Sequence, residues 1–359
     1  MIESLLSSWN GQSVVVHNDK PTGAVIIIAI HSSRLGPATG GTRMKPYANL
    51  GEAFEDAFRL SAGMTYKFAV PDLDRGGGKA VIVVPQDLAA QDRPDLLRRY
   101  GALIHQLGGL FYTGPDVGTT AADMDVIAET GHPYIFCRSP ECGGGGSPGP
   151  YTALGVFTAI QVANARVSSG TSLAGCRVLV QGVGSVGRRL IDHLMAAGVE
   201  VLFSEVDEAI ISQCRDELGL KFVPAQLIAS VDCDIYAPCA LGGVLNEDTI
   251  PQLKCRAVAG GANNQLSTPE AAEQLMARGI LYAPDYVVNV GGAMAICGIE
   301  LQGWSPGEAQ KRVSDSVREA LSRIFHLSQD ERITTDAAAR RIAEGNLARA
   351  RPKDMAPIG

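Results

Sequence analysis

The sequence predicts an α/β protein made of two domains. At 359 residues the chain exceeds the usual size of a single hydrophobic core. An apolar run, a glycine-rich turn and a helical pattern follow one another between residues 177 and 197, which is typical of a parallel β-α-β unit. The Gly- and Pro-rich stretch 143–150 indicates a hinge or domain boundary between two such folding units.

Charge and hydrophobicity exclude several classes of protein. The net charge of −7 argues against a nucleic-acid partner. The apolar run at 24–30 is too short to cross a bilayer, so no membrane partner is expected. The N-terminus lacks a basic region followed by a cleavable apolar core. These features predict a cytoplasmic enzyme.

Eight cysteines are spread over residues 137–297 without CxxC pairs or zinc-finger spacing. Cysteines in such a pattern are usually reduced, small and buried side chains. We therefore expect free thiols and no metal site.

Residues 50–67 form a predicted helix with Asn49 as its N-cap and Glu52 as the reciprocal partner of that cap. An apolar stripe at helical spacing runs from Leu50 to Met64, and its next position is Lys67. A lysine on such a face must lose its charge, pair with an anion or extend to solvent. Taken alone, Lys67 is better explained by extension to solvent.

Three glycines at 76–78 precede Lys79 and a predicted strand over 80–84. Ordering consecutive glycines costs conformational entropy, and close approach of the backbone to a ligand is the expected reason for them. The spacing differs from that of a Walker phosphate loop. Lys79 should therefore begin a buried strand beside a crevice, where burial and a second cation would lower its pKa and suit it to general-base catalysis.

A third loop carries a carboxylate. Residues 111–113 predict the end of a strand, Gly114 and Pro115 a turn, and Thr119 or Thr120 the cap of a following helix. Asp116 lies between them. By itself it is equally well explained as a turn residue, but two lysines and an aspartate in glycine-flanked segments of one domain indicate a site.

In the second half, the apolar run 177–181 predicts a buried parallel strand. A helical pattern over 188–197, a second apolar run at 201–203 and Glu205 follow, so the order is strand, glycine loop, helix, strand, acid. This order predicts a Rossmann-like, doubly wound domain that binds NAD with its pyrophosphate at the helix N-terminus. The charge of Glu205 suits ribose hydroxyls and disfavours a 2′-phosphate. The loop itself consists of Gly182, Val183, Gly184, Ser185, Val186 and Gly187.

Two later segments, 236–240 and 259–264, follow short apolar runs. Loops at the carboxyl ends of parallel strands face the ligand, so Cys239, Ala240 and Asn263 are expected near the cofactor. Asn263 is placed to orient a nicotinamide or substrate group, although alone it is equally a turn residue.

At these residues the chain resembles the glutamate/leucine/phenylalanine/valine dehydrogenase family. The matching segments run in family order over nearly the whole chain, at 35–43, 63–67, 76–79, 115–118, 182–187, 236–243, 260–264 and 284–292. The amino-acid substrate is implied by this resemblance and not by composition or spacing.

The resemblance implies NAD-dependent, reversible oxidative deamination of an L-amino acid to its 2-oxo acid and ammonia. It implies a substrate domain over 1–147, an NAD domain over 148–324 and a cleft that separates them and closes on both ligands. Helices over about 325–359 would pack back on the first domain. Relatives form dimers to octamers, so a homo-oligomer of unspecified size is expected.

The resemblance also assigns roles. Lys79 would be the general base, and Asp116 would move protons at the amino group. Lys67 would anchor the substrate carboxylate near the backbone of Gly40 and Gly41, and Asn289 would contact the substrate. At the cofactor, the resemblance adds Arg43 and Thr152 to the glycine loop, Glu205, Cys239, Ala240 and Asn263.

The identity of the amino acid is less determined. The matched pocket segments hold no cation for a glutamate side chain beyond the catalytic pair, so an apolar pocket is expected. Gly114 and Ala293 lack methyl groups that leucine enzymes usually carry, which predicts a larger pocket and favours phenylalanine. Valine, leucine and tryptophan stay open, because a few methylenes change specificity by only ~1–3 kcal/mol. The expected lining comprises Met64, Gly114, Pro115, Ala293 and Ile296.

Two other classes of function use the same glycine loop. A non-catalytic NAD sensor is disfavoured by the presence together of Lys67, Lys79 and Asp116. A methyltransferase should bind S-adenosylmethionine and ignore NAD, so a cofactor titration separates it from a dehydrogenase.

Overall fold

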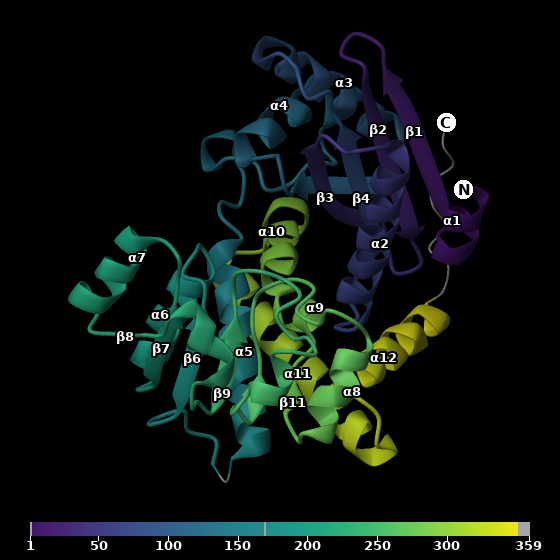
Figure 1. The fold of residues 1–359 in the computed structure, drawn as a ribbon. Helices are drawn as coiled ribbons and strands as arrows, with labels where there is room; N and C mark the ends of the chain where they lie inside the picture. The colour runs from purple at the N-terminus through teal and green to yellow at the C-terminus, as the bar shows by residue number, and fades with distance from the viewer. Residues whose placement is uncertain (1, 169, 351–359) are drawn as a thin grey trace. The chain divides into compact units, whose positions relative to one another are not determined.

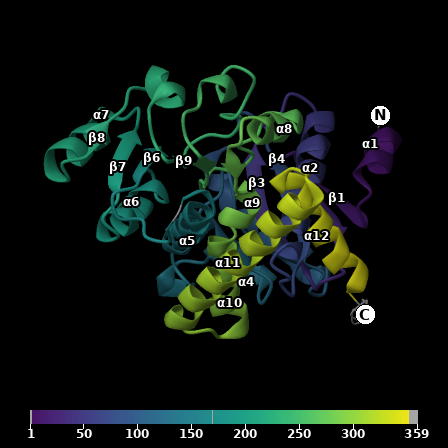
Figure 2. The same ribbon diagram turned by 90° about the horizontal axis from the view of Figure 1, so that it is seen from below.

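The computed structural model describes residues 2–168 and 170–350, which form two compact units. The first contains residues up to Gly146 together with Ile296–Gly303 and 343–350, and the second contains Ser147–Ala295 and Trp304–Ile342. The expected boundary at 325 falls inside α11 (Pro306–Glu331), a continuous helix that packs along α5 (Gly149–Val167) in the second unit (Figure 2). Residues 351–359, which the prediction assigned to the first domain, lie outside the described residues.

The first unit is built on a five-stranded mixed sheet in the order β1-β2-β4-β3-β5. Strands β1, β2 and β4 pair antiparallel, whereas β4, β3 and β5 run parallel. Figure 1 shows α3 and α4 side by side, with α2 next to the strands. The elements are α1 (Ile2–Trp9), β1 (Ser13–Asp19), β2 (Ala24–Ser32), β3 (Ala38–Lys45), α2 (Leu50–Ala69), β4 (Gly76–Val83), α3 (Arg93–Gln106), β5 (Phe111–Pro115) and α4 (Ala121–Gly131).

Alternate residues of β2, the second strand of this sheet, pack into two different cores. Ile26, Ile28 and Ile30 are fully buried in the cluster that contains α3 and α4. Ile27 and Ala29 point to the other face and pack with α2. This alternation is the expected consequence of the two-residue period of a strand buried on both faces. Packing on one face of the sheet therefore fixes the position of α2.

The glycines at 76–78 lie inside β4, which begins earlier than predicted and is buried throughout the run. A Cβ on Gly76 would lie 2.1 Å from the carbonyl oxygen of Ser32, and one on Gly77 would lie 2.1 Å from the backbone nitrogen of Thr65 in α2. A Cβ on Gly78 would lie 2.9 Å from the ring of Phe111. The expectation of ligand approach was wrong for these glycines, because the protein's own backbone and side chains occupy the space.

Helix α2 has the predicted N-terminus. The Asn49 side chain accepts a hydrogen bond from the Glu52 backbone N–H at 3.1 Å, as expected. The buried face is rotated from the predicted stripe, since Phe58 and Phe68 are buried while Leu50 is 45% exposed. Lys67 consequently lies half-buried at the edge of this face.

The last turn of α2 is completed by α12 (Thr335–Arg349). The buried Asn346 side chain donates a hydrogen bond to the carbonyl of Ala69 at 2.7 Å. A buried carbonyl at a helix end needs such a partner. Through residues 343–350, the end of the described chain thus packs on the first unit.

The second unit contains an all-parallel, six-stranded sheet in the order β11-β10-β9-β6-β7-β8. The succession β6, α6, β7 matches the predicted strand, loop, helix and strand, and Gly198 ends the helix segment with φ of 74°. The two-unit α/β architecture with a Rossmann-like sheet confirms the predicted fold class. The elements are β6 (Arg177–Gln181), α6 (Gly187–Ala196), β7 (Glu200–Ser204), α7 (Glu208–Ser212), β8 (Lys221–Phe222), β9 (Ile235–Pro238), β10 (Ala257–Val258), α8 (Glu270–Ala277), β11 (Leu281–Tyr282) and α9 (Asp285–Val288). Helix α10 (Gly291–Gln302) runs from the second unit into a segment of the first.

All eight cysteines are free thiols, and five of them are buried, as expected. Over residues 2–168 and 170–350, none of the helices has the length and apolar character needed to cross a membrane.

Gly77→Ala should destabilise the first unit, because its new methyl group would overlap the backbone of α2 at Thr65. We expect a loss of about 1–3 kcal/mol in the free energy of unfolding, measured by denaturant titration. Gly63→Ala is the matched control. In the described chain nothing lies within 4 Å of its Cβ position in α2, so it should stabilise by roughly 0.5–1 kcal/mol. Equal effects of the two substitutions would contradict the packing argument.

Candidate active site

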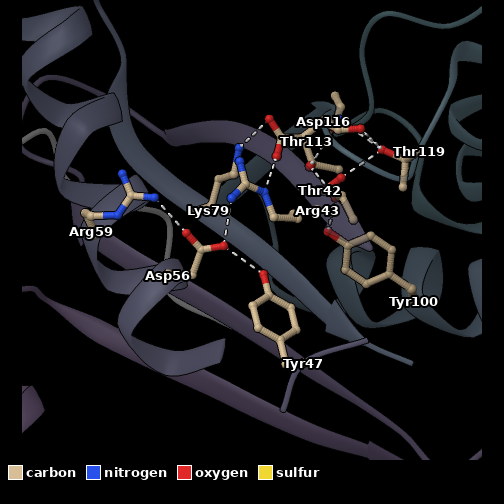
Figure 3. Close-up of polar contacts among 11 residues, drawn as sticks. Thr42, Arg43, Tyr47, Asp56, Arg59, Lys79, Tyr100, Thr113, Asp116 and Thr119 are labelled. Carbon is tan, nitrogen blue, oxygen red and sulfur yellow. Dashed lines mark hydrogen bonds and ion pairs between the residues drawn. The ribbon is translucent and has the colours of Figure 1, made fainter. Parts of the chain in front are cut away.

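The centre of the first unit is a buried ion pair. The ammonium Nζ of Lys79, in the middle of β4, lies 3.1 Å from Oδ1 of Asp116 (Figure 3). The Lys79 side chain is 6% exposed and that of Asp116 is 24% exposed. The structure therefore brings together two of the three residues that the sequence singled out for catalysis.

The loop that carries Asp116 is fastened to β3. The Asp116 backbone N–H donates to the hydroxyl of Thr119 at 2.9 Å, and that hydroxyl donates to the carbonyl of Thr42 at 2.8 Å. The backbone N–H of Met44 donates to the carbonyl of Val117 at 2.9 Å. Gly114 and Pro115, predicted as a turn, belong to β5, and Thr120 caps α4 as predicted. The turn after β5 is thus held on both sides of the carboxylate.

A cluster of buried hydroxyls lies under this loop. The Thr42 hydroxyl is 2.6 Å from the hydroxyl of Tyr100 and 2.7 Å from that of Thr113 (Figure 3). These contacts tie the neighbouring strands β3 and β5 to helix α3. They restrict sliding of β3 relative to β5. The position of Asp116, directly after β5, is fixed as a result.

Asp116 has a second cationic partner. The Nε of Arg43 is 2.7 Å from Oδ2 of Asp116, and its Nη1 is 2.7 Å from Oδ2 of Asp56 in α2. Asp56 also accepts from the Tyr47 hydroxyl at 2.8 Å and from Arg59 at 2.8 Å. Arg43, which is predicted to lie at the cofactor, has these two carboxylates as partners in the described chain. Asp56, Tyr47 and Arg59 were missed, because nothing in the helical pattern of α2 connects them with β3.

The environment shifts both members of the central pair. Burial lowers the pKa of Lys79; Asp116 opposes this shift, and the charge of Arg43 adds to it, so the pKa lies below its ordinary value. Burial would raise the pKa of Asp116, but Lys79 and Arg43 outweigh it, so the pKa of the carboxyl is lowered. Arg43 is thus a second cation that lowers the pKa of Lys79.

Two glycines of β3 lie against this pair. A Cβ on Gly41 would lie 3.2 Å from Nζ of Lys79, so any side chain there would press on the base. A Cβ on Gly40 would lie 1.9 Å from the carbonyl oxygen of Gly78 and 3.4 Å from Cγ of Met64. Lys67 follows Met64 by one turn of α2. The predicted substrate contacts Gly40 and Gly41 thus lie on β3, next to the strand β4 that carries Lys79, and Met64 lies on α2 with Lys67.

The expected enlargement of the pocket at Gly114 was wrong. A Cβ on Gly114 would lie 2.6 Å from Cε2 of Phe136, a buried ring that occupies the space of the missing methyl. The backbone N–H of Phe136 donates to the carbonyl of Thr113 at 2.9 Å, which holds the ring beside β5. Of the other lining candidates, Ile296 is fully buried in α10, and Pro115 lies at the end of β5.

In the second unit, glycine is needed at the three loop positions for different structural reasons. Gly182 has φ of 92°, and its Cβ would lie 2.6 Å from that of Ala240. A Cβ on Gly187 would lie 1.9 Å from the carbonyl oxygen of Gly182. Around Gly184, by contrast, no atom of the described chain lies within 4 Å of the Cβ position. Gly184 therefore leaves an open approach to the backbone, as a pyrophosphate requires.

The Glu205 carboxylate, directly after β7, is held in place by hydrogen bonds from backbone N–H groups. Glu205 accepts from the backbone N–H of Val183 at 2.8 Å, of Val206 at 2.6 Å and of Asp207 at 3.3 Å. Burial would raise the pKa of Glu205, but these hydrogen bonds outweigh it and the pKa is lowered. A fixed carboxylate beside the glycine loop fits the ribose of NAD and opposes a 2′-phosphate.

The remaining predicted positions of the second unit lie around the same loop. Gly261 packs between Val186 and Cys239, since its Cβ would lie 3.0 Å from the first and 3.7 Å from the sulfur of the second. The Asn289 amide donates to Oδ1 of Asn263 at 2.7 Å. Thr152 abuts Gly292 and lies three residues after Gly149, which is near the Ser185 carbonyl of the loop. Ala293 is half-buried in α10.

Gly184→Ala should weaken the binding of NAD without changing the stability of the fold, because only a ligand needs the space at this position. We expect at least about a tenfold rise in the dissociation constant, measured by fluorescence titration. Gly187→Ala should instead lower the melting temperature, since its methyl group would overlap the protein itself. Unchanged NAD affinity in Gly184→Ala would contradict the assignment of the loop.

Comparison with known protein families agrees with both units. Residues 13–132 match the Glu/Leu/Phe/Val dehydrogenase dimerisation domain, and residues 203–354 match the Glutamate/Leucine/Phenylalanine/Valine dehydrogenase model.

Individual relatives align over almost their whole length. The chain is 40% identical to leucine dehydrogenase of Geobacillus stearothermophilus, over 95% of this chain and 92% of the relative. It is 42% identical to valine dehydrogenase of Streptomyces virginiae, over 98% of both. The crystal structure of L-tryptophan dehydrogenase from Nostoc punctiforme is similar with a TM-score of 0.85 and 38% identity, covering 98% of this chain and 99% of that one. The chain belongs to the Glu/Leu/Phe/Val dehydrogenase family and is an NAD-dependent amino-acid dehydrogenase.

Proposed function

We propose that the protein catalyses the reversible oxidative deamination of an apolar L-amino acid, with Lys79 as the general base. The observation that carries the proposal is the buried Lys79–Asp116 pair, with 3.1 Å between Nζ and Oδ1 and a pKa of Lys79 that is lowered by burial. A lysine can act as a base near neutral pH only when its ammonium is destabilised in this way. Lys67 and the backbone of Gly40 and Gly41 would hold the substrate carboxylate.

Few residues are needed for the chemical steps of the deamination. NAD, held by the glycine loop and Glu205, would supply the acceptor for the hydride that leaves Cα of the amino acid. The substrate becomes an iminium ion, and neutral Lys79 takes a proton from the water that attacks this carbon. Asp116 takes a proton from the substrate ammonium before the hydride leaves and returns it to the amino group of the carbinolamine that water addition forms. The carbinolamine hydroxyl releases its proton to solvent, ammonia leaves, and the 2-oxo acid remains.

Within the apolar class, we propose a branched-chain substrate. The leucine and valine dehydrogenases that align with the chain support this choice. The argument for phenylalanine loses its basis at Gly114, because the Phe136 ring fills the space that would have enlarged the pocket. Tryptophan is the second candidate, on account of the similar tryptophan dehydrogenase structure.

The proposal includes a homo-oligomeric assembly of unspecified size. The family model matched by residues 13–132 is described as a dimerisation domain, which supports self-association through the first unit.

Lys79→Ala should reduce NADH formation from the best amino acid by at least about 10²-fold, because the attacking water loses its base. In the wild type, the deamination rate should rise from neutral toward alkaline pH. The neutral fraction of Lys79 increases as the pH passes through its pKa, and that pKa lies below the ordinary lysine value. Absorbance at the NADH band measures both effects. A rate that falls between about pH 7 and 10 in a folded enzyme would exclude the neutral-lysine mechanism.

A panel of valine, leucine, phenylalanine, tryptophan and glutamate should show the highest kcat/KM for a branched-chain substrate and the lowest for glutamate. Phe136→Ala empties the space beside Gly114 and should improve aromatic relative to branched substrates by ~1–3 kcal/mol. Steady-state NADH production measures each ratio. Preference for phenylalanine in the wild type, unchanged in Phe136→Ala, would refute the pocket argument.

A further inference from the structure

The pair at the centre of the site poses a charge problem. Asp116 is a partly buried carboxylate beside a lysine that must be neutral when it acts as base. Desolvation destabilises a carboxylate that has no countercharge and favours uptake of a proton. If Lys79 were the sole cation at Asp116, loss of the lysine's proton would also disturb the carboxylate.

Arg43 supplies a permanent countercharge on the other side of that carboxylate. Its Nε is 2.7 Å from Oδ2 of Asp116, while Lys79 holds Oδ1 at 3.1 Å. The two cations thus use different oxygens of one carboxyl group. A guanidinium is always protonated at physiological pH, so its half of the arrangement persists when Lys79 is neutral.

Asp56 in turn holds Arg43 in place. The Arg43 Nη1 is 2.7 Å from Oδ2 of Asp56, and the Asp56 side chain is only 13% exposed. The Tyr47 hydroxyl and the Arg59 guanidinium donate to the same carboxylate, both at 2.8 Å. With both Nε and Nη1 engaged, the guanidinium plane is fixed in orientation.

We propose that Arg43 and Asp56 are positioning residues that keep Asp116 ionised and oriented toward Lys79 while Lys79 gains and loses its proton. This inference rests on the proposed function of Lys79 and extends it to a second layer that spans β3 and α2 (Figure 3). The route from Lys79 through Asp116 and Arg43 to Asp56 consists of alternating charges. Arg43 and Asp56 can therefore be changed without removing a group that the proposed mechanism places on the substrate.

The charged groups around Lys79 come from four segments. Asp116 follows β5, Arg43 lies on β3, and Asp56, Arg59 and Lys67 lie on α2, with Tyr47 between β3 and α2. Of these, Asp116 and Asp56 raise the pKa of Lys79, and Arg43 lowers it. Arg43 and Asp56 thus have opposite signs of effect on the same group.

The test is the pH dependence of kcat/KM for deamination in three variants. Arg43→Gln removes a cation and should move the midpoint of the rising limb to higher pH, by at least ~0.5 unit. Asp56→Asn removes an anion and leaves Arg43 to pull Asp116 away from Lys79, so its midpoint should move to lower pH. Arg43→Lys keeps the charge but not the fork of donors. It should leave the midpoint near that of the wild type while kcat falls about 10- to 100-fold with little change in KM.

Asp19→Asn is the matched control. Asp19 is a buried carboxylate of the same unit, 2.5 Å from Arg99 of α3, on the face of the sheet away from α2. Its loss should lower the melting temperature and leave both kcat and the midpoint unchanged. Circular dichroism and thermal unfolding of every variant separate folding effects from catalytic ones.

Midpoints that stay fixed, or that move in the same direction in Arg43→Gln and Asp56→Asn, would overturn the inference. A shift in Asp19→Asn equal to that in Asp56→Asn would do the same. If Asp56→Asn fails to fold, the contrast between Arg43→Lys and Arg43→Gln decides. A wild-type enzyme that forms no NADH from any amino acid of the panel refutes the proposed function itself, whereas an active wild type with unmoved midpoints refutes only the second layer.

Discussion

The close packing of β4 against its neighbours is the constraint on which the site of the first unit depends. Gly77 lets the strand approach the backbone of α2 at Thr65, and Gly76 lets it approach the carbonyl of Ser32. With a side chain at Gly77 the helix would have to move away from the sheet. Lys79 follows directly along the same strand, and Asp56 and Lys67 lie on the same helix. The glycine run thus sets the distance between the two elements that carry the charges.

Given that distance, burial and charge compensation decide the chemistry. Burial favours a neutral Lys79, and the ionised Asp116 opposes this, so the balance depends on what else neutralises the carboxylate. Arg43, on β3, neutralises the Asp116 carboxylate. Asp56 in turn balances the positive charge that Arg43 adds. A buried ion pair of this kind contributes little to stability by itself, but it holds defined charges at defined points. The site therefore combines a rigid frame with one group that is free to titrate.

In the second unit, the loop glycines serve two purposes, close packing within the protein and access for a ligand. Gly182 and Gly187 are required by contacts within the loop and with Ala240, whereas Gly184 borders open space. Glu205 is oriented by backbone donors, including that of Val183 in the loop itself. The loop and the acid therefore form one preorganised structure. The Glu205 carboxylate, which follows β7, stabilises the turn that follows the neighbouring strand β6. Such a turn needs little rearrangement to receive a dinucleotide.

Local patterns in the sequence determined much of this protein. The Asn49 cap, the Thr120 cap and the strand-loop-helix order around the glycine loop depend on residues close together in the chain, so they were predictable. Lys79 and Asp116 could be assigned to one site because both follow recognisable glycine-flanked segments, whereas their ion pair came from the structure. The tertiary structure alone decided which atoms fill the space around a glycine and which charges meet. That the run at 76–78 serves packing, that Phe136 fills the place beside Gly114, and that Arg43 joins Asp116 to Asp56 all depend on contacts between distant segments. Spacing along the chain does not encode such contacts, because they arise from the register and separation of neighbouring strands and helices.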